Sequence, residues 1–285
     1  MSLRYLSVLL AIACMYGAPA PAPAADDAPK TSEKPKTDEK PKTDEKPKAP
    51  AGPMRVLFVG DELSEKGHIG QLVTRMAQAA KEPRRFYSQD IGSAGSTLEK
   101  HYKGSTYWNT VADQRWDYVV LQEDAQVILR YRDATVRYAR ELDRSIRKHR
   151  ASTVLFSTWA PQDQADGHKN LAKANDEVAT AIRAAVLPVG LAWQEAATAA
   201  KDIPLYQPDK RYASPQGEYL TACVFYGFFY NKSAESLPAD IHKGVKAEEA
   251  KALAAIAWKV VQETKNAKPQ PPEEKSKAPA KPATK

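Results

Sequence analysis

The chain has 285 residues and a formal net charge of +7, most of which lies outside residues 54–264. That segment carries 28 Lys and Arg against 26 Asp and Glu, a net charge of about +2, and it is long enough for one domain with its own core. Because nucleic-acid binding requires a clustered basic face, the composition predicts no nucleic-acid partner. Residues 26–53 and 265–285 are rich in Lys and Pro, with too few apolar side chains to fold, so we expect a disordered linker and a disordered tail.

The N-terminus has the layout of a secretory signal peptide that covers residues 1–25. Arg4 precedes a short apolar run at 6–13, and small residues suited to a signal peptidase follow, with cleavage expected near Ala25. The run is too short for a permanent transmembrane segment, so we expect a secreted or periplasmic protein. The alternative is a lipoprotein signal that ends at Cys14 and attaches the chain to the envelope by a lipid anchor.

Five short apolar runs rich in β-branched residues predict buried strands. They lie at residues 55–60, 84–91, 117–123, 152–159 and 187–193. Segments with helical spacing of apolar residues lie at 69–81, 135–149, 170–186, 215–230 and 245–264. Alternation of continuous apolar strands with helices is typical of a parallel sheet covered on both faces. We therefore predict an α/β fold, a three-layer α/β/α sandwich around a five-stranded parallel sheet.

The helix predicted at 215–230 has a clear start. Ser214 precedes Pro215, which is the order expected for a capping residue and a first helical residue. The same helix contains Cys223, the only cysteine outside the expected signal peptide. Its apolar surroundings favour core packing over a nucleophilic role.

In a parallel sheet of this kind, functional residues lie beyond the carboxyl ends of the strands. The segments in these places are residues 61–62, 92–95, 122–126, 159–163 and 193–195, together with the loop 206–219. Trp159 and Trp193 lie at two of the predicted strand ends. Their rings could stack on a sugar there, or they could cover the core.

The motifs in these places resemble those of the SGNH or GDSL-type hydrolases, in the style of exported bacterial members. The matching stretches are "LFVGDE" (57–62), "GSAGSTLEKHY" (92–102), "YVVLQE" (118–123), "LAW" (191–193) and "DKRYASPQGEYLTACVFY" (209–226). They occur in the order and spacing of the family, across about residues 55–231. The resemblance implies a flavodoxin-like fold and the chemistry of ester hydrolysis.

In that family a serine attacks the acyl carbonyl, a histidine acts as the base, and an aspartate orients the histidine. The resemblance places Glu62 at the serine position and Tyr212 at the histidine position. It places Asp209 at the position of the orienting aspartate. Two of the three catalytic residues are therefore substituted, whereas the surrounding motifs are retained.

The family also holds the developing oxyanion with preset hydrogen-bond donors. The resemblance places Gly95 at the main-chain donor, and two residues, Gln122 and Gln126, stay open as the side-chain amide. Asp61 and Trp159 complete the set of residues that we expect to contact a ligand.

Local replacements for the missing groups are few. Ser64 lies two residues after Glu62, but on a helix start its side chain would face about 200° away. His101 and His168 lie near the predicted rim and are the only histidines placed to act as a base. The acidic rim leaves open a Ca²⁺ or Mg²⁺ site, but no His or Cys ligand spacing is present, so we predict no metal and no cofactor.

The prediction for function is an SGNH-type protein of the cell envelope that has lost its catalytic pair. It would bind an acylated glycan or an ester-like ligand without serine-type turnover. The alternative is an active hydrolase of simple or carbohydrate esters with a rearranged site, using Glu62, Ser64 or a bound metal.

Overall fold

The structure is a computed structural model, and it describes residues 52–63, 68–164 and 166–267. The expected signal peptide, Cys14, nearly all of the expected linker, Ser64 and most of the expected tail lie outside the described residues.

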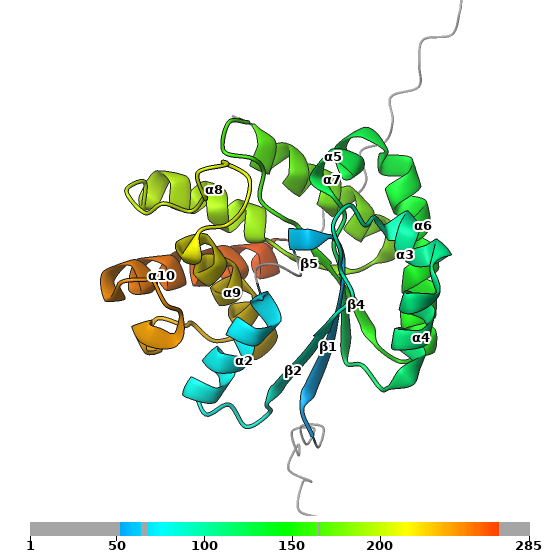
Figure 1. Cartoon of the computed structure of the whole chain (residues 1–285), viewed down its shortest axis with the longest axis horizontal. Coiled ribbons are helices and arrows are strands. Elements are labelled where there is room, and N and C mark those ends of the chain that lie inside the picture. The colour runs from blue at the N-terminus through cyan, green and yellow to red at the C-terminus, as the bar shows by residue number, and fades with distance from the viewer. Residues whose placement is uncertain (1–51, 64–67, 165, 268–285) are drawn as a thin grey trace, which may run out of the picture. The chain divides into compact units, whose positions relative to one another are not determined.

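Five parallel strands form one sheet in the order β2-β1-β3-β4-β5 (Figure 1). Their bounds are β1 (Met54–Val59), β2 (Phe86–Asp90), β3 (Tyr118–Leu121), β4 (Ser152–Phe156) and β5 (Ala185–Leu187). In the register of the central pair, Val56 lies opposite Tyr118 and Phe58 opposite Val120. Strands β1 and β3 at the centre are mostly apolar because helices cover both faces of the sheet, whereas the edge strand β2 is mostly polar. The predicted α/β class with a five-stranded parallel sheet is confirmed.

The helices form two layers, one on each face of the sheet (Figure 1). One layer contains α3 (Leu98–Lys103), α4 (Ser105–Asp113), α5 (Ala125–Arg130), α6 (Arg132–Lys148) and α7 (Gly167–Ile182). The other contains α2 (Ile69–Ala79), α8 (Val189–Ala199), α9 (Pro215–Tyr230), α10 (Ala247–Asn266) and the short 3₁₀ helix η1 (Ala239–Ile241). Because successive strand residues point to opposite faces, Val56 and Phe58 pack in one core, and Leu57 and Val59 in the other.

The fifth predicted strand, residues 187–193, is wrong in its extent. Strand β5 ends at Leu187, and helix α8 begins at Val189. Pro188 lies at the junction, where its fixed φ and missing N–H end the ladder. Trp193 therefore lies within α8 and is fully buried, not at a strand end. The helix predicted at 170–186 is likewise too long, because α7 ends at Ile182.

Helix α9 begins as predicted. The Ser214 side chain accepts a hydrogen bond from the Gly217 N–H, and Pro215 occupies the first helical turn. Cys223 is buried in the middle of this helix, which confirms the prediction that it packs in the core. Within the described part of the chain, none of the helices combines the length and the apolar composition that a membrane crossing requires.

Candidate functional site

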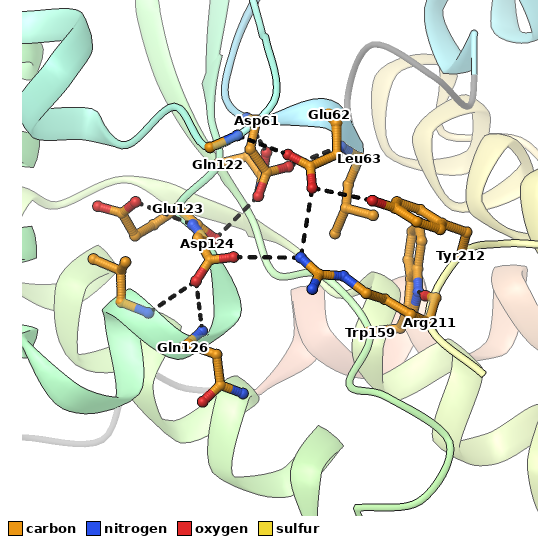
Figure 2. A network of polar contacts seen from close by, with 12 residues as sticks. Asp61, Glu62, Leu63, Gln122, Glu123, Asp124, Gln126, Trp159, Arg211 and Tyr212 are labelled. Atoms are coloured by element: carbon orange, nitrogen blue, oxygen red, sulfur yellow. Dashed lines mark hydrogen bonds and ion pairs between the residues drawn. The ribbon is translucent and has the colours of Figure 1, made fainter. Parts of the chain in front are cut away.

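The candidate site lies at the carboxyl end of the sheet, where three segments distant in sequence meet (Figure 2). Residues 61–63 follow β1, residues 122–126 follow β3, and residues 209–212 belong to the loop between α8 and α9. An isolated antiparallel bridge between Tyr206 and Ala213 closes that loop. The polar residues that follow separate strands therefore converge, as is expected at the carboxyl edge of a parallel sheet.

Asp61 is a buried carboxyl group that shapes the loop after β1. Its Oδ1 accepts a hydrogen bond from the Leu63 N–H at 2.8 Å, and its own main-chain N–H donates to Gln122 Oε1 at 2.7 Å. Burial raises the pKa of Asp61 to about 6. Because only 1% of its surface is exposed, Asp61 supports the loop from beneath, and the ligand contact predicted for it is not accessible.

Gln122 is buried beside Asp61 and is bonded at both ends of its amide. Its Oε1 accepts from the Asp61 N–H, and its Nε2 donates to the Glu123 carbonyl at 3.0 Å. Gly60 permits this approach, since a Cβ at that position would lie 2.3 Å from Gln122 Oε1. Gln122 therefore ties the loop after β1 to the loop after β3. The prediction that its amide faces a ligand is wrong, because only 1% of the residue is exposed.

Glu62 is the carboxylate on which the site converges. Its Oε2 accepts a hydrogen bond from the Gly95 N–H at 3.1 Å, and its Oε1 accepts from the Tyr212 hydroxyl at 3.2 Å. The Arg211 guanidinium lies 3.5 Å from the same Oε1. Partial burial alone would raise the pKa of Glu62, but hydrogen bonds from its own N–H, Gly95 and Tyr212 and the charge of Arg211 outweigh burial and lower it.

The backbone conformation at residue 95 requires a glycine. Its φ of +68° lies in the left-handed region, which residues with a Cβ rarely adopt. This conformation directs the Gly95 N–H toward Glu62. The structure therefore brings together Glu62, Gly95 and Tyr212, which the resemblance placed at the nucleophile, oxyanion-donor and base positions.

The loop before α9 is held in shape by its own main chain. Asp209 Oδ1 accepts hydrogen bonds from the N–H groups of Arg211 and Tyr212, at 2.9 and 3.0 Å. Lys210 adopts a left-handed conformation with φ +60°, which tightens the turn. These contacts place the side chains of Arg211 and Tyr212 beside Glu62 (Figure 2).

Trp159 anchors the same loop from the other side. Its indole N–H donates to the Arg211 carbonyl at 2.9 Å, and its ring stacks on Trp193 with centroids 4.4 Å apart. Trp159 is 3% exposed and Trp193 is fully buried. Both rings therefore pack mainly in the core, and contact of Trp159 with a ligand stays a prediction.

Arg211 is a site residue that the sequence analysis did not single out. Its guanidinium lies between two carboxylates, 3.5 Å from Glu62 Oε1 and 4.0 Å from Asp124 Oδ2, and its side chain is 55% exposed. The only sequence signal was its position directly before Tyr212, in a loop expected at the rim. A carboxylate at the nucleophile position suggests a cationic partner nearby, and this rim loop was a place to look for one.

A small pocket of about 50 Å³ opens beside Arg211. It is lined by Leu63, Asp124, Ala125, Gln126, Trp159, Pro161 and Arg211. Asp124 caps α5 by accepting from the main-chain N–H groups of Gln126 and Val127. Figure 2 shows the Gln126 side chain pointing away from Glu62, so its amide lies at the pocket wall and not over the carboxylate.

Glu123 is a second buried carboxyl group near the site. Its oxygens accept from the main-chain N–H groups of Asp124, at 3.0 Å, and Leu98, at 3.4 Å. Burial raises the pKa of Glu123 to about 7. Figure 2 shows its carboxyl group turned away from Glu62. Glu123 therefore links the loop after β3 to the start of α3.

Neither histidine near the rim is positioned as a base for residue 62. His101 Nε2 lies 2.7 Å from the Gly60 carbonyl oxygen, and burial lowers the pKa of its ring. His168 Nδ1 accepts from the Ala160 N–H, its Nε2 lies 3.2 Å from the Tyr206 hydroxyl, and burial lowers its pKa to about 4. Both rings are therefore neutral structural groups at neutral pH.

The described side chains around Glu62 offer hydrogen-bond donors and a cation. They include no serine hydroxyl and no histidine within hydrogen-bond distance of its carboxylate. Across the described ranges, no group of three or more His, Cys, Asp or Glu side chains is arranged to hold a metal ion. The arrangement can bind and orient a polar group, but it has no paired nucleophile and base.

No protein-family model and no curated protein sequence matches the chain. Solved structures do match. A DUF4886 family protein from Bacteroides uniformis superposes with a TM-score of 0.65 at 18% identity, over 73% of this chain and 95% of that one. A candidate SGNH hydrolase from Slackia heliotrinireducens superposes with a TM-score of 0.53 at 21% identity, over 61% of this chain and 98% of that one. An acetylxylan esterase from Geobacillus stearothermophilus superposes with a TM-score of 0.48 at 15% identity, over 61% of this chain and 93% of that one.

At these identities the likeness is one of fold. The chain has the SGNH-hydrolase fold, as the sequence motifs implied.

Proposed function

We propose that this is a cell-envelope protein of SGNH-hydrolase fold that binds an acylated glycan or another ester-like ligand without serine-type turnover. The observation that carries the proposal is the environment of Glu62. Its carboxylate stands at the position that the resemblance assigns to the nucleophilic serine. It accepts hydrogen bonds from Gly95, at the oxyanion-donor position, and from Tyr212, at the base position.

This arrangement opposes the chemistry of a serine hydrolase. The Gly95 N–H would stabilise an oxyanion only if it were free, and here it is bonded to a side-chain carboxylate. The Tyr212 hydroxyl donates a hydrogen bond to the same carboxylate, and a neutral phenol is a poor base for a nucleophile. An ionised carboxylate held by these donors is suited to orienting a ligand hydroxyl or amide.

The neighbouring pocket supports an ester-like ligand. Leu63, Trp159 and Pro161 give it an apolar wall, and its volume of about 50 Å³ suits a group as small as an acyl substituent. The Arg211 guanidinium lies at its edge, more than half exposed, and its contacts to Glu62 and Asp124 are long. It can therefore turn to a carbonyl or hydroxyl oxygen of the ligand.

The location is proposed from the sequence alone. The layout of residues 1–25 and the Lys- and Pro-rich segment that follows favour export and an extended tether.

The test for turnover is hydrolysis of 4-nitrophenyl acetate by the parent and by Glu62→Ser, Tyr212→His and the double variant. We expect the parent and both single variants to be inert, and the double variant to gain activity. Ser64→Ala is the control for a misassigned nucleophile. Hydrolysis by the parent that Ser64→Ala abolishes would refute the proposal.

The test for binding is calorimetric titration with an acetylated oligosaccharide and with the same oligosaccharide after chemical deacetylation. We expect only the acetylated form to bind. Arg211→Ala should weaken binding roughly tenfold, because one hydrogen bond from a charged group is lost. Lys210→Ala, which removes the neighbouring exposed charge, should leave binding unchanged. Equal affinity for both oligosaccharides would refute the ester-like ligand.

A further inference from the structure

The outer face of α6 concentrates positive charge that the rest of the domain lacks. The described residues hold 28 Lys and Arg against 25 Asp and Glu, a net charge of +3. Residues 130–150 alone hold eight Lys and Arg against three acidic residues, a net charge of +5. The other described residues are therefore slightly acidic in sum, and the domain is electrostatically one-sided.

The charges on α6 form a line along the helix. Arg137, Arg140, Arg144 and Lys148 follow one another at spacings of three and four residues, which places them on one face, and all four are exposed. The line runs for about 16 Å along the helix axis. We name these four residues the basic stripe. The opposite face of α6, with Leu142 and Ile146, packs in the core.

Little within the domain neutralises the basic stripe. Among the described residues, neither Arg140 nor Lys148 has a carboxylate or hydrogen-bond partner. Arg144 pairs only with Glu141, and that pair is exposed to solvent and so weak. Two acidic residues share this face of the helix, Asp133 at its start and Glu141 beside Arg144. Arg137 donates to the Tyr138 hydroxyl, which in turn donates to Glu99.

A partly exposed tryptophan, Trp108, is connected to one residue of the stripe through two tyrosine rings. The Arg137 guanidinium lies 4.5 Å over the Tyr138 ring, and the Tyr102 ring follows at 5.6 Å from Tyr138. The Trp108 ring lies 5.6 Å beyond Tyr102 and is 38% exposed. Its indole N–H donates to the Tyr102 carbonyl, which leaves the ring itself as an apolar contact surface. Helices α3, α4 and α6 lie in the same layer (Figure 1).

We infer that the basic stripe, together with Trp108, is a peripheral binding surface for anionic phospholipid headgroups. Arginine guanidinium groups bind phosphate oxygens with two parallel hydrogen bonds, and three of the four residues of the stripe are arginines. Tryptophan favours the headgroup region of a bilayer, where its ring is partly desolvated. A row of cations on an outer helix meets the plane of a membrane without any groove.

A polynucleotide fits these observations less well. Proteins that bind single strands line a basic channel with several stacking rings, and here one partly exposed tryptophan lies at the flank of a single row. The surface also differs from the candidate ligand site, which lies at the carboxyl edge of the sheet and is built by residues 61–63, 122–126 and 209–212. Binding of a membrane would leave that site open.

The experiment is flotation of the full chain with vesicles of phosphatidylcholine alone, and with vesicles of phosphatidylcholine and phosphatidylglycerol in equal parts. We expect binding only to the anionic vesicles, weakening as salt is added. The variant Arg140→Gln/Arg144→Gln/Lys148→Gln should partition at least about tenfold more weakly. The matched control is Lys201→Gln/Lys243→Gln/Lys251→Gln, which removes three exposed charges from α10 and from the loops that follow α8 and η1.

The outcomes separate the explanations. Equal loss in both triple variants would mean that total charge drives binding, and unchanged binding in the stripe variant would mean that the stripe is not used; either overturns the inference. Binding to soluble polyphosphate but not to vesicles would reassign the stripe to a soluble polyanion. As an independent readout, brominated lipids should quench tryptophan fluorescence in the parent and not in Trp108→Phe. Circular dichroism verifies that each variant is folded.

Discussion

The Tyr212 hydroxyl donates a hydrogen bond to Glu62 Oε1 at 3.2 Å, although 150 positions separate the two residues in the chain. The bond joins the loop after β1 to the loop before α9. The other oxygen of Glu62 accepts from the Gly95 N–H, so three loops meet at one carboxylate. Because an ionised carboxylate is the stronger acceptor, this junction is most stable when Glu62 is charged.

Tyr212→Phe removes one of the donors that lower the Glu62 pKa, so that pKa should rise. The variant should lose about 1 kcal/mol of stability at neutral pH. A carboxyl group with a lowered folded pKa stabilises the fold above its unfolded pKa, and this contribution disappears as the pH falls through the folded value. The deficit of Tyr212→Phe should therefore shrink below about pH 4. Urea unfolding of the parent and the variant, from neutral pH to below pH 4, measures this stability deficit.

Tyr131→Phe is the matched control for that experiment. Tyr131 is 62% exposed, so the loss of its hydroxyl should leave stability unchanged at every pH. A pH-independent deficit in Tyr212→Phe would show that its ring packing matters and its bond to Glu62 does not.

Asp61 and Glu123 should make the domain less stable as the pH rises toward neutrality. Burial raises their pKa values to about 6 and about 7, so the folded state keeps protons that the unfolded chain has already released. The contribution of these two groups to stability is then largest near pH 4, falls as the pH rises to about 7, and is flat above. His101 and His168, whose pKa values are lowered by burial, contribute in the opposite direction over the same range, so the two carboxyl groups are read from variants and not from the parent curve alone. Thermal melting of the parent, Asp61→Asn and Glu123→Gln tests this. Each variant should gain stability relative to the parent as the pH rises from about 5 to 7, and a difference between parent and variant that stays constant over this range would contradict the assignment.

Gly60→Ala should disturb the link between the first and third loops. The added Cβ would lie 2.3 Å from Gln122 Oε1, which already accepts from the Asp61 N–H. Displacement of this buried amide, which makes hydrogen bonds through both its oxygen and its nitrogen, should cost about 1–3 kcal/mol of stability. The double variant Gly60→Ala/Gln122→Ala relieves the clash, so its loss should be smaller than the sum of the two single losses. Additive losses in chemical denaturation would show that no such clash occurs.

Two glycines of α9 should respond in opposite ways to alanine. At Gly217 a Cβ would lie 2.3 Å from the Leu205 carbonyl oxygen and 2.7 Å from the Trp193 ring. At Gly227 its nearest neighbour, in the Trp258 ring, would be 3.5 Å away, which is ordinary contact. Gly217→Ala should therefore destabilise the domain by about 1–3 kcal/mol, whereas Gly227→Ala should be neutral or stabilise it by up to about 1 kcal/mol. Melting temperatures of both variants decide the matter.

Much of the fold could be predicted because its signals are local. Strand β1 and helix α9 lie where the apolar run and the Ser214-Pro215 start placed them. The segment 187–193 could not be assigned in the same way, because a short apolar run fits a buried strand and a buried helix equally well. Pro188 ends the strand, and Trp193 then packs on Trp159 in the core, a contact that depends on the whole domain.

The site was predictable where a motif fixed the main chain. The resemblance placed Glu62, Gly95 and Tyr212, and the structure brings them into contact, although their roles stay predictions. The role of Gln122 could not be read from the sequence. The residues beside it in the chain are the same whether its amide joins two loops or faces a ligand. Arg211 was missed because its importance comes from two carboxylates on other loops.

The pairing of α2 with α9 has a consequence for synthesis of the chain. The apolar face of α2, with Ile69, Leu72 and Met76, belongs to the core that α9 completes, yet residues 80–214 lie between the two helices. At translation rates of about 5–20 residues per second, roughly 7–27 s pass before α9 is made. During that interval the α2 face lacks its final cover, so the nascent chain is most exposed to aggregation and proteolysis before its last third emerges.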